Sequence, residues 1–143
     1  MRRAFALLAV LALPVLAACD SIEEPAPNEP IPSYTVTYTA TLEGDEDAVE
    51  DAAVRYTAAN GTTVTATTLP FSLTVTSTRA GQSSIALSGI FRNDGSSPSA
   101  TLSVRARAAR GATELQVSSQ IREFNDLADG DQVRVAGSVS VFQ

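Results

Sequence analysis

The amino-acid sequence predicts an all-β fold, an antiparallel sandwich of seven or eight short strands at residues 33–143. Apolar and polar residues alternate with a period of two through most of this part, as half-buried strands require. Short runs rich in Gly, Asn and Pro separate the alternating segments. Nothing after residue 19 keeps the spacing of an amphipathic helix, and the acidic run at residues 43–51 permits one turn at most.

The first predicted strand, residues 34–42, has the clearest alternation. One face carries apolar residues, namely Tyr34, Val36, Tyr38, Ala40 and Leu42. Threonines occupy the other face, where β-branched side chains suit the exposed side of a strand. A second strand at residues 52–57 leads into Asn60-Gly61, a strong hairpin signal because both residue types tolerate positive φ.

Six further strands follow from the same pattern. Residues 62–68 predict the third strand, and Leu69-Pro70 separates it from a fourth that begins with Phe71, Leu73 and Val75. The remaining four lie at residues 85–91, 102–107, 115–121 and 133–141. Gly89 and Gly137 fall inside strands, which predicts a bulge or a close backbone approach at each.

The N-terminus carries a separate signal. Arg2 and Arg3 precede an apolar stretch at residues 4–18, which is shorter than the roughly 20 residues that a membrane-spanning helix needs. These features predict a cleavable signal peptide at residues 1–18. Leu16-Ala17-Ala18-Cys19 resembles the lipobox of bacterial lipoproteins. The resemblance implies a thioether-linked lipid on Cys19, cleavage after Ala18 and acylation of the new amino terminus. The alternative is an ordinary secretory signal with an incidental cysteine.

Residues 19–32 are predicted to be a tether: the lipidated Cys19 followed by a segment rich in Pro and acidic residues. Such a segment is extended and stiff, at about 3.1 Å per residue, and reaches roughly 40 Å. Two or three acyl chains would anchor it stably. Asp20 resembles the inner-membrane retention signal of enteric bacteria, whereas Asp20, Glu23 and Glu24 resemble the export tag of Bacteroidota surface lipoproteins. The predicted location is the cell envelope, with the outer membrane favoured, on its periplasmic or surface side.

Composition excludes several classes of function. After Cys19 the chain has eight Arg against sixteen Asp and Glu, a formal net charge of −8, which disfavours binding to nucleic acid. It has no His, the usual general base and commonest metal ligand. Lipidation of Cys19, the single cysteine, would leave no thiol for catalysis or a disulfide. We therefore predict no catalytic residues, no cofactor and no enzymatic activity.

Two acidic segments are the only candidate metal sites. Asp45, Glu46, Asp47, Glu50 and Asp51 form one, and Asp126, Asp129 and Asp131 form the other. Carboxylates suit Ca²⁺, but neither spacing matches a known calcium loop, so solvated loops are the favoured interpretation and no metal ligand is assigned. Paired carboxylates can also hydrolyse glycosides, which requires a cleft that the sequence does not indicate.

Other residues have a functional and a structural interpretation. Arg105 and Arg107 share one strand face and would bind an anionic partner, or else guard the sheet against edge-to-edge aggregation. Phe91, Phe124 and Phe142 are predicted to lie in the core or to cover a sheet. Ser83 and Ser84 have no base to activate them.

Residues 34–121 resemble the periplasmic domain of the mycobacterial membrane small proteins, the MmpS family. The matching segments are Tyr34-Thr35-Val36-Thr37-Tyr38, Ala53-Val54-Arg55-Tyr56-Thr57-Ala58-Ala59-Asn60-Gly61 and Leu69-Pro70-Phe71, where the family has Leu-Pro-Trp. The resemblance implies an immunoglobulin-like sandwich and a role as an accessory subunit of a membrane exporter. The chain departs from the family in having a lipobox in place of a membrane helix, no domain disulfide, and an added strand region after Ile121.

The function predicted from the sequence is that of a membrane-anchored cell-envelope lipoprotein that acts as a non-catalytic interaction module. Its partner would be an envelope protein, with a transporter as one candidate. The alternative is a lipoprotein that binds a small ligand or Ca²⁺.

Overall fold

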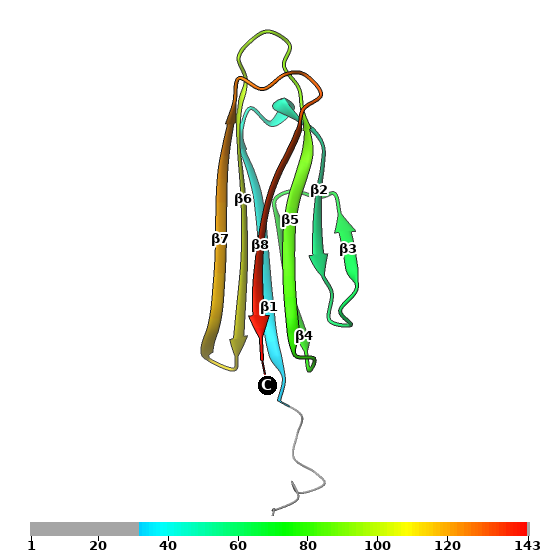
Figure 1. Ribbon diagram of the computed structural model, residues 1–143, viewed down its shortest axis with the longest axis vertical. Helices are drawn as coiled ribbons and strands as arrows, with labels where there is room; N and C mark the ends of the chain where they lie inside the picture. Colours follow the sequence, from blue (N-terminus) through cyan, green and yellow to red (C-terminus); the bar gives the residue numbers. More distant parts are fainter. Residues whose placement is uncertain (1–31, 143) are drawn as a thin grey trace, which may run out of the picture. The chain divides into compact units, whose positions relative to one another are not determined.

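Eight strands make up most of residues 32–142, the part of the chain that the computed structural model describes (Figure 1). They are β1 (Tyr34–Gly44), β2 (Val49–Thr57), β3 (Thr63–Ala66), β4 (Phe71–Ser77), β5 (Gly81–Phe91), β6 (Ser99–Arg110), β7 (Thr113–Asn125) and β8 (Gln132–Val141). One 3₁₀ turn, η1 (Glu46–Ala48), joins β1 to β2 and is the only helical element in the described residues. The predicted all-β fold is confirmed.

The strands form two four-stranded sheets, and every neighbouring pair is antiparallel. Sheet A has the order β4-β1-β6-β7, and sheet B has the order β3-β2-β5-β8. Figure 1 shows the start of β1 and the end of β8 at one end of the sandwich. The loops β1–β2, β5–β6 and β7–β8 gather at the other end, which we call the tip.

The core lies between the sheets and is built from alternate residues of the paired strands. In sheet A, Val36, Tyr38 and Ala40 of β1 stand opposite Ala108, Ala106 and Val104 of β6, and all six are buried. Sheet B contributes the buried side chains of Val54, Ile85, Leu87, Phe91, Val133, Val135, Val139 and Val141. Period-two alternation therefore predicted the inward face of β1 correctly, and the burial of β5, β6 and β8 alternates in the same way.

Gly89 is required by the close approach of β2. The β2–β5 register shifts between Glu50 and Ala53, so that β2 bulges against β5 at this point. A Cβ atom on Gly89 would lie 2.4 Å from Val49 Cγ1 and 2.9 Å from the Glu50 carbonyl oxygen. No side chain fits at those distances, which confirms the close approach that the glycine inside the strand predicted.

Tyr38 ties the two sheets together at the centre of the core. Its ring is fully buried, and its hydroxyl donates a hydrogen bond of 2.9 Å to the carbonyl oxygen of Thr57 in sheet B. Burial raises the pKa of Tyr38 above its ordinary value, so the hydroxyl stays protonated and remains a donor. The ring also stands 5.8 Å from that of Tyr56, which in turn lies 5.2 Å from Phe71.

Tyr38→Phe is therefore expected to lower the free energy of unfolding by about 1 kcal/mol, because it removes the donor to the partly buried Thr57 carbonyl oxygen. Urea denaturation of the purified protein would measure the change. Tyr56→Phe is the matched control, since Tyr56 belongs to the same ring cluster but is only partly buried. Equal losses for the two variants would contradict the assigned role of the Tyr38 hydroxyl.

Candidate functional site

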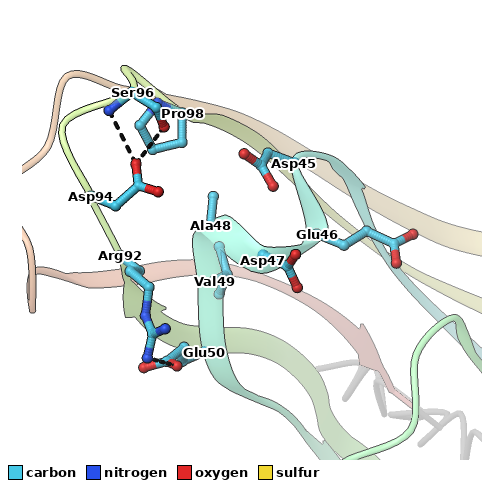
Figure 2. A pocket seen from close by; sticks show the side chains of 10 residues that line it. All are labelled: Asp45, Glu46, Asp47, Ala48, Val49, Glu50, Arg92, Asp94, Ser96 and Pro98. Atoms are coloured by element: carbon cyan, nitrogen blue, oxygen red, sulfur yellow. Dashed lines mark hydrogen bonds and ion pairs between the residues drawn. The ribbon is translucent and has the colours of Figure 1, made fainter.

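The tip carries an open pocket of about 370 Å³. Figure 2 shows the ten residues that line it: Asp45, Glu46, Asp47, Ala48, Val49, Glu50, Arg92, Asp94, Ser96 and Pro98. Backbone hydrogen bonds fix its two walls. The Arg92 amide donates to the Ala48 carbonyl oxygen at 2.9 Å, and the Asp45 amide donates to the Ser99 carbonyl oxygen at 3.0 Å. The first predicted acidic segment thus lies beside the β5–β6 loop.

Three charged side chains of this pocket have local partners: Arg92, Glu50 and Asp94. Arg92 forms an ion pair with Glu50, and this carboxylate raises the pKa of the guanidinium. Both side chains are about half exposed, at 56% and 45%, so the pair contributes little to stability. Asp94 accepts hydrogen bonds from the Ser96 hydroxyl and from the Ser96 amide, the latter at 3.1 Å. Figure 2 shows these contacts and also shows the carboxylates of Asp45, Glu46 and Asp47 spread around η1.

The second acidic segment, in the β7–β8 loop, makes hydrogen bonds at the tip. Asp129 accepts a hydrogen bond of 3.2 Å from the Asn93 amide, and Asp131 accepts one of 3.0 Å from the Ala128 amide. The Phe91 amide donates to the Asp131 carbonyl oxygen at 2.7 Å. Within residues 32–142, no three Asp, Glu, His or Cys side chains are placed to hold a metal ion. Asp129 and Asp131 therefore belong to a hydrogen-bonded loop, whereas Glu50 and Asp51 of the first segment lie at the start of β2.

Strand β7 has an unusual surface, because three of its four apolar residues, all except Phe124, lie outside. Val117 and Ile121 stand opposite Arg107 and Ser103 of β6, on the outer face of sheet A. Val117 is 37% exposed and Ile121 is 65% exposed. Leu115 is 42% exposed at a bulge where the β6–β7 register shifts. We refer to Leu115, Val117 and Ile121 as the β7 strip.

Before Phe124, the inner face of β7 is polar, and this has a structural reason. Sheet B ends at β8, whose free edge lies against this face. The Ser138 amide donates to Ser118 Oγ at 3.3 Å, and the Ser140 amide donates to Gln116 Oε1 at 2.6 Å. Gly137 allows this approach, since a Cβ atom there would lie 3.0 Å from Ser118 Oγ. Two β7 side chains thus satisfy backbone donors of β8 that have no neighbouring strand.

The two arginines singled out in the sequence lie beside the β7 strip. Arg105 and Arg107 are exposed on the outer face of sheet A, where they line a pocket of about 400 Å³ with Thr37, Thr39 and Glu114. Arg107 Nε donates to Glu114 Oε2 at 2.6 Å, so its charge is balanced within the chain. The strip was missed by the sequence analysis, although its residues are those of the predicted strand at residues 115–121.

The three phenylalanines singled out in the sequence differ in how far they are buried. Phe91 is fully buried, and Phe124 is partly buried against the core, as predicted. Phe142 is 81% exposed, so its predicted place in the core or over a sheet was wrong. It follows the last residue of β8, where neither sheet extends to cover it. Leu16, Ala17, Ala18 and Cys19 lie outside the described residues.

No protein-family model, curated protein or solved structure matches this chain. The resemblance to the MmpS family therefore stays a prediction. Across residues 32–142, no helix reaches the length and apolarity that crossing a bilayer requires.

The hydrogen bonds from Ser96 lower the pKa of the Asp94 carboxyl below the ordinary aspartate value of about 3.9. Because folding lowers this pKa, ionised Asp94 favours the folded loop above that value, and the contribution disappears as pH falls through the lowered one. We expect carbon-detected NMR to give the reduced pKa, and Ser96→Ala to return it toward the ordinary value. An unchanged Asp94 titration in Ser96→Ala would contradict this cause.

Proposed function

We propose that this protein is a membrane-anchored cell-envelope lipoprotein whose sandwich is a non-catalytic interaction module, and that the module binds a protein partner through β7. The observation that carries the proposal is the exposed β7 strip. A row of large apolar side chains on the outer face of an edge strand is a feature of protein-binding surfaces, because a solvent-facing strand position normally carries a polar residue.

Edge strands bind partners by adding a strand to the sheet, with backbone hydrogen bonds for affinity and alternate side chains for specificity. Three further features favour β7 for this role. It is the last strand of sheet A, it is 13 residues long, and its central residues, 116–121, include no charge, Pro or Gly. Charges and prolines are the usual means of blocking such an edge.

The anchoring part of the proposal depends on the lipobox-like residues and on the predicted tether at residues 19–32. A transport accessory role, which the MmpS resemblance implies, is the narrower form of the same proposal. The tip offers less support for a ligand site, because four of its carboxylates have local hydrogen-bond or ion-pair partners. No three acidic side chains in the described part of the chain are placed to hold a metal ion.

Lipidation predicts a defined mature amino terminus. Mass spectrometry of the membrane-extracted protein should give a chain that begins at Cys19 and carries acyl groups, and a labelled fatty acid should be incorporated. Cys19→Ala should lose the label, whereas Ser21→Ala, which leaves the lipobox intact, should retain it. A mature chain that starts elsewhere, or one without acyl groups, would disprove the anchor.

The partner surface can be tested by photocrosslinking in native membranes. The chain has no Lys, so amine-reactive reagents are unsuitable, and p-benzoylphenylalanine placed at position 121 is the better probe. We expect a discrete covalent adduct from position 121. Position 90 is the control, because Ile90 is an exposed apolar residue at 38% on the outer face of sheet B. Equal labelling from both positions, or none from position 121, would refute the proposed surface.

A further inference from the structure

We propose that the partner of β7 is a second copy of this chain, whose own β7 adds as an antiparallel strand and joins the two A sheets into one. The inference depends on the proposed function and identifies its partner. Three features support a second copy: the open edge of β7, the symmetry of the pairing and the side chains that the pairing brings together.

The β7 edge is the one long edge that the described residues leave open. β3 and β4, the edge strands on the other side of the sandwich, have only four and seven residues. The β8 edge is occupied, since Ser138 and Ser140 donate their amide protons to β7 side chains. Among residues 32–142, the β7 backbone makes strand-type hydrogen bonds to β6 alone, so one side of this strand retains unpaired donors and acceptors.

Symmetry selects the antiparallel arrangement. A twofold axis perpendicular to the sheet keeps both outer faces on the same side, so the two β7 strips become one continuous apolar surface. A twofold axis along the strands would pair them in parallel and turn one sheet over. The exposed Val117 and Ile121 of one copy would then lie beside the polar inner face of the other.

A pairing centred on Ser119 matches the side chains of the two strands. It places Val117 opposite Ile121 of the second copy, and this contact occurs twice because of the twofold axis. The other facing pairs are Gln116 with Arg122, Ser118 with Gln120, and Ser119 with itself. No charge faces a like charge in this register. Like charges directly opposite each other would destabilise a strand pair. This register also keeps the paired run, residues 116–122, clear of the bulge at Leu115.

Such a strand pair is small compared with a standard protein–protein interface of about 1,600 Å². We therefore expect weak association of the free domain in dilute solution. Confinement of both copies to one membrane raises their effective concentration and favours pairing without any new contact. For this reason the test uses the full chain in its native membrane.

Ser119→Cys places two thiols across the twofold axis. Cβ atoms of directly opposed residues in an antiparallel pair lie about 4.5–5.5 Å apart, near the separation that a disulfide needs. Mild oxidation of membranes should convert this variant to a covalent homodimer, with a yield at least about tenfold above that of Thr65→Cys. Thr65 is the matched control, since it is exposed on the edge strand β3 of sheet B. Cys19 is common to all variants, and its predicted thioether link to lipid would leave no second thiol to compete.

Charged substitutions at the two apolar positions test the register of the strand pair. In the Ser119→Cys background, Ile121→Arg should lower the dimer yield by about tenfold, because an arginine then faces Val117 of the second copy. Adding Val117→Glu should restore the yield, since each new arginine then faces a glutamate. Both positions are exposed, and circular dichroism would confirm that each variant is folded. A failure of the second substitution to restore pairing would rule out the Ser119-centred register.

The photocrosslinking probe at position 121 separates this inference from the proposed function. An adduct that contains only this chain, together with the Ser119→Cys dimer, supports self-association. An adduct with a different protein would overturn the second copy as the partner, but it would still support the proposed interaction module. Absence of any adduct overturns both. A Ser119→Cys dimer yield equal to that of Thr65→Cys would mean that the disulfide forms by random collision, and it would overturn the proposed homodimer.

Discussion

The fold depends on one constraint: alternate side chains from two sheets must fill a single apolar layer. Strands have a side-chain period of two, so a slip of one residue in any pairing would expose a whole set of buried side chains. Most core residues are small, with Val and Ala prevailing, which allows the sheets to come close. Tyr38 is the largest fully buried side chain in the described residues, and its hydroxyl reaches a carbonyl oxygen of the facing sheet.

The eight strands could be predicted from the sequence because their alternation and turn residues are local properties. The boundaries were less accurate: β5 begins at Gly81, four residues before the predicted start, since Gln82 and Ser84 pair with β8 through backbone groups that their side chains do not reveal. The orientation of β7 could not be predicted. Alternation shows that Val117 and Ile121 share a face, but which face turns inward depends on where sheet B ends, which is a tertiary property.

The tip was predictable in composition and unpredictable in arrangement. The acidic residues of both segments lie in loops or in η1, except Glu50 and Asp51, which belong to β2. Glu50 and Asp129 find their partners, Arg92 and Asn93, in a third loop, and the sequence gives no sign that this loop would supply them. The same holds for β7, where Ser118 and Gln116 appear as ordinary polar strand residues until the free edge of β8 lies against them.

The position of β1 has a mechanical consequence. The strand begins two residues after the first described residue and lies between β4 and β6, with ladders on both sides. Hydrogen bonds in antiparallel ladders run perpendicular to the strands. A pull on the chain at Pro32, directed along β1 while the tip is held, would load both ladders in shear, so that many bonds must break together instead of one after another. The domain therefore resists mechanical unfolding when force is applied at the end where the predicted tether attaches.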